Sequence, residues 1–302
     1  MPDLIDLSQL EKISPLFKTE EGQKLGRRLY RLAGVERANI AYNKYYEYHG
    51  AAFARKLLED IGVRYKVSGL DVLDSLRDSS FITISNHAYG GLDGVMLIDL
   101  VASRFPDFKV MVNKFLTLVK PLDENFISVI PRTEDTDRIM TQSLTGVREA
   151  LAQIHDKKPL GFFPAGAVSN LHLRDWFFPW TSSSEVKRTT AYSQQVRAIY
   201  DRPWQESVIR IIKKARVPII PIRFFDRNSM YFYMLGKINW RVRAIQLPRE
   251  VFNKGGKNIR IAIGKPITPQ EQGKYTSMDE FGRFLRSSVY EIPLPESYTV
   301  VG

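Results

Sequence analysis

The feature that most restricts the fold is an alternation, from Val63 onward, of short apolar runs with longer segments of helical spacing. The runs are rich in Ile, Val and Phe and indicate buried strands at residues 63–67, 81–85, 108–112, 160–163, 217–225 and 259–263. Between them, as in 95–105 and 140–154, apolar residues recur every three or four positions. This alternation predicts an α/β fold with a mainly parallel mixed sheet flanked by helices. In such sheets, ligands bind at the carboxyl ends of the strands.

An N-terminal helical segment is expected at residues 1–62, ahead of an α/β domain at 63–302. Apolar residues at helical spacing form a first stripe (Leu25, Leu29 and Leu32) and a second one (Tyr42, Tyr46, His49, Phe53 and Leu57). Basic residues lie between the positions of the first stripe (Lys24, Arg27, Arg28 and Arg31). Two interpretations stay open: the solvated face of a helix that packs on the core, or a cationic face that lies on anionic lipid.

Within the α/β domain, periodicity weakens over an aromatic-rich insertion at about 170–204. Its stretch DWFFPW (175–180) has four aromatic residues in six, an unusual density for a loop that stays in water. The aromatic side chains either pack back over the core or form a lid that dips into a membrane interface, where Trp is favoured.

The stretch ISNHAYGGLDG (84–94) lies where the predicted strand at 81–85 ends, and it carries the most reactive pair of side chains. The imidazole of His87 can accept a proton from a hydroxyl as that oxygen attacks a carbonyl. A carboxylate one turn away, Asp93, can fix the tautomer and stabilise the imidazolium. Gly90 and Gly91 let the backbone fold tightly enough for the two side chains to meet. The simpler alternative is that Asn86 and Asp93 only cap the following helix.

Four blocks in this order resemble the glycerolipid acyltransferases, the family that includes bacterial 1-acylglycerol-phosphate acyltransferases. The blocks are NHAYGGLD (86–93), FISVIPR (126–132), FFPAGAVS (162–169) and VPIIPIRF (217–224). The resemblance runs from about residue 63 to residue 270. It implies an O-acyltransferase that moves a fatty acyl group from a thioester to the hydroxyl of a lysolipid, with His87 and Asp93 as the catalytic pair.

The sequence departs from the family pattern at two points. Five residues separate His87 from Asp93, where the family has four, and Asp99 is the alternative partner. Ala165 stands where the family carries the glutamate of Phe-Pro-Glu-Gly, a residue associated with the acceptor. Both departures, with DRNSMYFY (226–233), are similar to the hemolysin-like branch that acylates lyso-ornithine or lyso-glycine lipids. The resemblance therefore implies an amino-acid lysolipid, or an acceptor like lysophosphatidic acid.

The remaining candidates are expected to bind substrate around this pair. Arg132 offers a forked donor set for a carboxylate or phosphate head group, and Arg223 is a second anion-binding candidate. The turn after the strand at 160–163 could support a developing oxyanion through its backbone N–H groups. The full set of substrate-binding candidates is Asn86, Gly90, Gly91, Arg132, Pro164, Ala165, Gly166, Ser169 and Arg223.

Charge and cysteine usage bound the chemistry and the partners. Forty-four Lys and Arg against 33 Asp and Glu give a formal charge of +11, which favours an anionic membrane surface or an acidic carrier protein. The chain has no Cys, so a cysteinyl thioester intermediate is excluded. No cofactor or metal is expected, and the co-substrate would be an acyl-acyl carrier protein or acyl-CoA. The N-terminus has no secretory pattern and no apolar run approaches the ~20 residues of a membrane span, so we expect a cytoplasmic protein, peripheral on the inner face of the membrane.

Three other functions fit the sequence less well. A hydrolase would need a nucleophile, and the sequence has neither a Gly-x-Ser-x-Gly elbow nor Cys. A nucleic-acid partner is not expected, because basic residues are scattered and no zinc-finger pattern occurs. The main alternative is a non-catalytic lipid- or membrane-binding protein on a degenerate acyltransferase fold.

Overall fold

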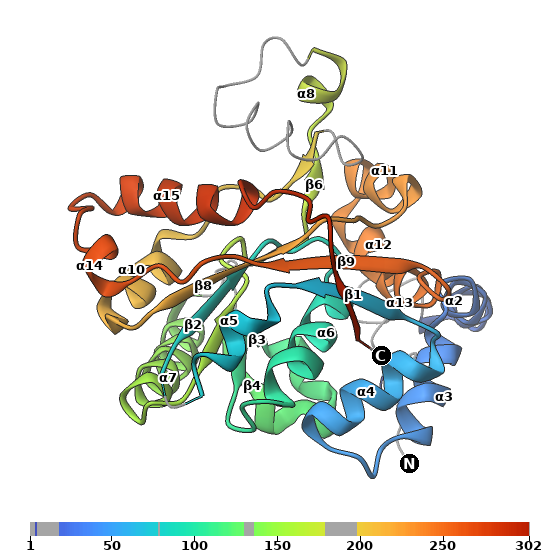
Figure 1. The fold of residues 1–302 in the computed structure, drawn as a ribbon. Helices are drawn as coiled ribbons and strands as arrows, with labels where there is room; N and C mark the ends of the chain where they lie inside the picture. The colour runs from blue at the N-terminus through green and yellow to red at the C-terminus, as the bar shows by residue number, and fades with distance from the viewer. Residues whose placement is uncertain (1–3, 5–17, 78, 130–135, 179–197, 302) are drawn as a thin grey trace.

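The computed structural model describes residues 4, 18–77, 79–129, 136–178 and 198–301. Within them, eight strands form one sheet in the order β10-β1-β9-β8-β2-β5-β3-β4 (Figure 1). The strands of this sheet are β1 (Arg64–Ser68), β2 (Ile82–Ser85), β3 (Lys109–Asn113), β4 (Phe126–Val129), β5 (Leu160–Phe162), β8 (Ile219–Phe224), β9 (Asn258–Ile263) and β10 (Thr299–Val301). Only the β1–β10 and β8–β9 pairs are antiparallel, which confirms the predicted mainly parallel mixed sheet.

Helices cover both faces of the sheet and also precede it. They are α2 (Glu20–Leu32), α3 (Val35–Lys44), α4 (Gly50–Asp60), α5 (Leu70–Asp74), α6 (Gly91–Ala102), η2 (Lys114–Leu118), η3 (Lys120–Asn125), α7 (Thr136–His155), α8 (Leu173–Phe177), α10 (Glu206–Ala215), α11 (Met230–Ile238), α12 (Trp240–Ile245), α13 (Leu247–Phe252), α14 (Pro269–Gln272) and α15 (Met278–Tyr290). Side chains of α4 and α6 pack on one face of the sheet, and those of α7, α10 and α15 pack on the other.

Strand β8 illustrates how alternation builds the two faces. Ile220 and Ile222 join the core under α4 and α6, whereas Ile219 joins the core under α7, α10 and α15. Successive side chains of a strand point to opposite faces, so a strand buried on both sides reads as a continuous apolar run. That is why VPIIPIRFF was recognisable as a strand in the sequence.

The N-terminal helices are present as expected, but the first leucine stripe faces outward. Leu25 and Leu32 are exposed, Leu32 by 67%. The buried face of α2 consists instead of Gly22, Gly26 and Tyr30. The division into two domains at residue 62 stays a prediction. No helix in the described part of the chain is both long and apolar enough to cross a bilayer.

A short hairpin leaves the sheet near its carboxyl edge. Strands β6 (Asn170–Leu171) and β7 (Ile199–Tyr200) pair antiparallel, with Leu171 opposite Ile199. Helix α8 follows β6 directly and projects from the body of the molecule (Figure 1). Trp176, Phe177 and Phe178 are exposed there, so these three aromatic residues of the insertion do not pack back over the core. Pro179 and Trp180 lie outside the described residues.

We expect Gly69→Ala to be among the most destabilising glycine substitutions. Gly69 has φ +81°, and a Cβ there would lie 2.4 Å from the carbonyl oxygen of Ile263 on the neighbouring strand. The left-handed conformation alone costs roughly 1–2 kcal/mol for an L-residue, and urea unfolding should show a loss of at least this size. Gly282→Ala is the matched control: its nearest neighbour would be 3.6 Å away, within α15. There the free energy of unfolding should rise by about 0.5–1 kcal/mol. Equal effects of the two changes would contradict the geometry.

Candidate active site

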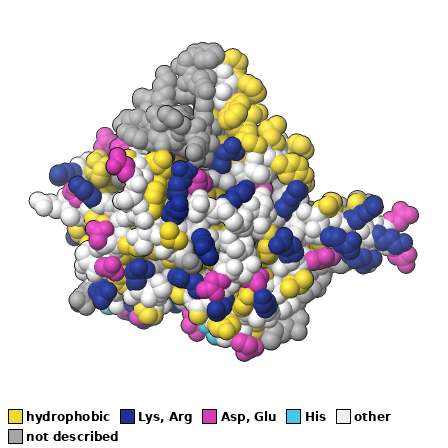
Figure 2. Space-filling model, turned by 45° about the vertical axis from the view of Figure 1, so that its right-hand side comes forward, with side chains coloured by type: hydrophobic (Ala, Val, Ile, Leu, Met, Phe, Trp, Pro, Cys, Tyr) yellow, Lys and Arg dark blue, Asp and Glu magenta, His cyan; other side chains and the backbone are white. Residues whose placement is uncertain are grey.

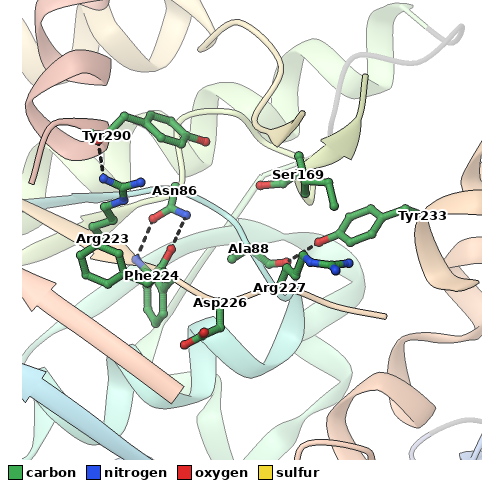
Figure 3. A pocket seen from close by; sticks show the side chains of 11 residues that line it. Asn86, Ala88, Ser169, Arg223, Phe224, Asp226, Arg227, Tyr233 and Tyr290 are labelled. Carbon is green, nitrogen blue, oxygen red and sulfur yellow. Dashed lines mark hydrogen bonds between the residues drawn. The ribbon is translucent and has the colours of Figure 1, made fainter. Parts of the chain in front are cut away.

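The carboxyl ends of three strands meet where the sequence predicts a site. β2 lies between β5 and β8 and runs parallel to both. Asn86, which follows β2, connects the end of β2 to the end of β8. Its side-chain amide donates to the Phe224 carbonyl at 2.9 Å and accepts from the Phe224 N–H at 2.8 Å (Figure 3). Asn86 is buried. The side chain that was expected to bind substrate is therefore engaged in fixing the start of the His87 loop to β8.

His87 and Asp93 meet despite the extra residue between them. The Nδ1 atom of His87 lies 3.0 Å from Oδ2 of Asp93. Asp93 is fully buried and also accepts from the backbone N–H groups of Tyr89, Gly90 and Gly94. An ionised carboxylate can only accept, so Nδ1 of the imidazole donates and Nε2 keeps its lone pair. The pair thus has the arrangement that a general base requires.

The two glycines accommodate the extra residue in different ways. Gly90 has φ +88° and precedes α6, and a Cβ there would lie 2.9 Å from Leu247 and 3.0 Å from Val168. Gly91 is the first residue of α6, and a Cβ at this position would meet nothing within 4 Å. Gly90 is therefore the position at which the loop requires glycine. It turns the chain so that Asp93, in the first turn of α6, faces back toward His87.

Phe163 packs flat against the other side of the imidazole. The two rings stack with centroids 4.5 Å apart and an interplanar angle of 29°. The carboxylate and the ring together restrict both the position and the rotation of the His87 side chain, of which 18% remains exposed. Phe163 lies within the quoted FFPAGAVS block, but its type alone gave no sign of this contact.

Asp201 is the residue of the site that sequence reasoning missed. It is fully buried, and its Oδ1 accepts from the Ser169 hydroxyl at 2.6 Å and from the His87 N–H at 3.2 Å. Oδ2 accepts from the indole of Trp204, and the Tyr290 hydroxyl lies 2.9 Å from the Asp201 nitrogen. The carboxyl group therefore ties the backbone of the His87 loop to the loop after β5, and the backbone N–H of Asp201 connects it to α15. Asp201 is the residue directly after β7. It comes after a stretch without periodicity, and no sequence motif indicated its role.

Charge around His87 shifts its titration. Burial lowers the pKa of His87, but the charge and hydrogen bond of Asp93, with the charge of Asp201, raise it overall above its usual value. The pKa of Asp201 is itself raised, because its burial outweighs the hydrogen bond from Ser169 and the attraction of His87. Two carboxyl groups on different elements thus act on one imidazole.

The turn after β5 lies against the same loop. Ser169 donates its N–H to the His87 carbonyl at 2.8 Å, and the Gly166 N–H donates to the Phe163 carbonyl at 2.9 Å. The oxygen of Pro164 accepts from the Gln205 N–H. Both N–H groups are thus engaged within the protein, and the predicted oxyanion role of this turn stays a prediction.

Ala165 is fully buried in this turn. Its carbonyl accepts from the Arg202 guanidinium at 2.7 Å and from the Gln205 amide at 3.3 Å. A glutamate side chain in this environment would have to be buried or would displace the turn. Recognition of the acceptor head group by a carboxylate at this position is accordingly absent from the chain.

The two arginine candidates have different outcomes. Arg132 lies outside the described residues. Arg223 is buried, and its guanidinium donates to the backbone carbonyls of Tyr290 and Ile292, which anchors the end of α15 to β8 (Figure 3). Its predicted role in anion binding stays a prediction. Asp99, the alternative partner, pairs with Arg55 and accepts from the Tyr65 hydroxyl, away from His87.

The DRNSMYFY stretch holds the His87 loop from the side of α11. The Tyr233 hydroxyl donates to the Ala88 carbonyl at 3.3 Å, and the Asn228 amide donates to the Tyr89 carbonyl at 3.1 Å. Figure 3 shows the pocket that results, lined among others by Ala88, Ser169, Arg227 and Tyr233. Within the described residues, no group of three or more His, Asp and Glu is placed to hold a metal ion.

The chain is similar to proteins of known family. A family model described as Acyltransferase matches residues 10–294. A lyso-glycine lipid O-acyltransferase of Bacteroides thetaiotaomicron is 23% identical over 270 residues, which cover 87% of this chain and 88% of that protein. A protein of the same name from Phocaeicola vulgatus is 22% identical over 304 residues, 96% of each chain. The crystal structure of PlsC, a 1-acyl-sn-glycerophosphate (LPA) acyltransferase from Thermotoga maritima, aligns with a TM-score of 0.43 and 12% identity, covering 79% of this chain and 78% of that one.

Proposed function

The chain belongs to the Acyltransferase family, and from this premise we propose that it moves a fatty acyl group from a thioester to the free hydroxyl of a lysolipid. The observation that carries the proposal is the hydrogen bond between Nδ1 of His87 and buried Asp93, which leaves Nε2 as a base. A non-catalytic lipid-binding protein would not need this tautomer.

The reaction follows from the position of the proton. Nε2 of His87 takes the proton of the acceptor hydroxyl as that oxygen attacks the thioester carbonyl. The imidazolium that forms is stabilised by Asp93, and the tetrahedral intermediate then expels the thiolate as the C–S bond breaks. His87 returns its proton to this thiolate, so the products are an ester and a free thiol, and the enzyme is regenerated. During both proton transfers, Phe163 holds the imidazole ring of His87 in position and Asp201 holds its backbone.

We propose an amino-acid lysolipid of the lyso-glycine class as the acceptor. The two relatives that carry that name support this choice, as does Ala165, which removes the glutamate associated with glycerol-phosphate acceptors. The donor is acyl-acyl carrier protein or acyl-CoA. The formal charge of +11 favours the acidic carrier protein.

The test offers the purified protein several lysolipids with each thioester, and follows the products by mass spectrometry. The proposal requires an O-acylated amino-acid lipid with release of one thiol per ester. Esterification of lysophosphatidic acid alone would correct the acceptor class. Absence of any ester with all pairs would overturn the proposed function.

The excess of 44 Lys and Arg over 33 Asp and Glu also supports action at an anionic membrane surface, on the cytoplasmic face.

The pH dependence gives a prediction about Asp201. Since the pKa of His87 is raised and the base works only when neutral, kcat/KM should rise with pH through a value above the ordinary histidine pKa of about 6.5. Asp201→Asn keeps an oxygen for the His87 N–H and the Ser169 hydroxyl but removes the charge. The pKa of His87 should then fall, and the acid limb of the profile should move to lower pH. Asp226→Asn, which removes a carboxylate paired with Arg260 instead, is the control. An unmoved acid limb in Asp201→Asn would refute the electrostatic role.

A further inference from the structure

Exposed apolar side chains are concentrated on the elements beside the site. On α8 and the residue after it they are Leu173, Trp176, Phe177 and Phe178, and on α11 and α12 they are Tyr231, Met234, Ile238, Trp240 and Val242. Figure 2 shows hydrophobic side chains gathered at the upper right of the molecule, with Lys and Arg side chains below them. We call these nine residues the apolar edge. Contiguous apolar surface of this kind marks an interaction site.

Helix α11 presents this edge by its own periodicity. Tyr231, Met234 and Ile238 stand three and four positions apart, which places them on one side of the helix. The opposite side carries Phe232 and Tyr233, which are buried against the β6–β7 hairpin. Ile238 is 82% exposed and Trp240 is 65% exposed. A helix that is apolar on both sides and leaves one of them to solvent lacks a partner for that side.

The charge of these elements selects the partner. The basic residues on α8 and α11–α13 include Arg174, Lys237 and Arg249, all exposed. The acidic residues on the same helices are engaged: Asp175 accepts from the Tyr200 hydroxyl, and Glu250 is buried in a pair with Lys254. Apolar and aromatic side chains beside exposed basic ones fit an anionic lipid surface, where Trp and Tyr lie at the head groups.

The apolar edge also borders the reacting imidazole. Tyr233, on the buried side of α11, donates to the carbonyl of Ala88, the neighbour of His87. Ile238 lies five residues after Tyr233 on the same helix, about 7.5 Å along its axis at 1.5 Å per residue. On the other flank, Ser169 contacts the His87 carbonyl and α8 begins at Leu173. A bilayer against this edge would therefore face the loop that carries the base.

We propose that α8, α11 and α12 form the membrane-docking surface of the protein and bind an anionic bilayer directly. The proposal rests on the proposed function for its purpose, the delivery of a lysolipid from the bilayer to His87. It differs from the alternative in which the N-terminal helix lies on the lipid, since that alternative uses Leu25 and Leu32 at the far end of the chain.

Sedimentation with phosphatidylcholine vesicles, with and without phosphatidylglycerol, tests the surface without any substrate. The double variant Ile238→Glu/Trp240→Glu and, on a separate element, Phe177→Glu should each lower the partition coefficient on anionic vesicles by about ten-fold or more, because they remove apolar contact and add repulsion. Leu32→Glu/Ile40→Glu is the matched control, since both residues are 67% exposed on the N-terminal helices. Its partition coefficient should equal that of the wild type. Thermal unfolding should be the same for all, because each side chain is largely exposed.

The outcomes separate docking from catalysis. Vesicle binding that survives both variants of the apolar edge, that is lost only in the N-terminal variant, or that is absent in the wild type overturns the docking surface. A wild-type dimer that dissociates in Ile238→Glu/Trp240→Glu, with vesicle binding retained, would assign the surface to a second copy instead. Acyl transfer to a monomeric short-chain lysolipid is measured in parallel. If the wild type shows none while docking behaves as expected, the proposed function fails and the surface stands.

Discussion

His87→Ala should abolish acyl transfer while the protein remains folded. The variant removes the proposed base, and general-base assistance is typically worth ~100- to 10,000-fold in rate. The side chain is partly exposed and packs mainly on Phe163, so the fold should tolerate its loss. Single-turnover ester formation, followed by mass spectrometry at saturating lysolipid and thioester, measures the effect on the chemical step.

A histidine elsewhere on the surface gives the control for this experiment. His155 lies at the end of α7 with its side chain 90% exposed, and His155→Ala should transfer acyl groups at the wild-type rate. If His87→Ala retained turnover within about ten-fold of the wild type, far less than the usual contribution of a general base, the protein would be using another base. A variant that lost turnover but kept binding to lysolipid would separate the enzyme from a purely lipid-binding protein.

Asp93→Asn should reduce kcat nearly as much, for a reason that concerns the tautomer. The carboxylate accepts from Nδ1 of His87 and from three backbone N–H groups, whereas an amide has one oxygen to accept with and an NH₂ group that donates. If the NH₂ group faces Nδ1, the imidazole proton moves to Nε2 and the base is lost. The corresponding change in a serine protease triad costs about 10,000-fold in kcat, and we expect a loss between ~100- and 10,000-fold here.

Asp93→Asn should lower the free energy of unfolding much less than it lowers the rate of acyl transfer. Weakening the cap of α6 costs roughly 1 kcal/mol, so thermal unfolding should show a modest decrease. Asp99→Asn is the matched control: it removes another buried carboxylate from α6, one that pairs with Arg55 and Tyr65. It should destabilise the protein while kcat per folded molecule stays near the wild-type value. Equal losses of kcat in both variants would mean that α6 as a whole, not the His87 tautomer, sets the rate.

The strands and the central pair were predictable because each leaves a local signal. A run buried on both faces, such as 217–225, contains few polar residues, and the paired glycines announce a tight turn between His87 and Asp93. The structure confirms the sheet and brings the pair together at 3.0 Å. The catalytic role of this pair stays a prediction until the substitutions are measured.

Asp201 and the α11–α12 part of the apolar edge could not be predicted, for the opposite reason, whereas membrane contact by the aromatic residues of DWFFPW was one of the two interpretations that the sequence left open. Asp201 is 114 residues from His87 in the chain. It reaches the site only because the loops after β2 and β5 lie against the end of β7 in the folded protein. The leucines of α2 are misleading because the buried face of the helix is formed by Gly22, Gly26 and Tyr30 instead. The exposed side of α11 carries aromatic and aliphatic residues that, in sequence, resemble those of a core helix.

The β6–β7 hairpin has a consequence for how this protein could diversify. Because Leu171 and Ile199 are paired, the chain that leaves the body at one residue returns beside it, and Asp201 is reached in the same register whatever lies between. Substitutions on α8, which lies outside this pairing, need not disturb the imidazole. The hairpin thus fixes the position of Asp201 independently of α8, so the exposed residues of α8 can diverge while Asp201 keeps its contact with the His87 backbone.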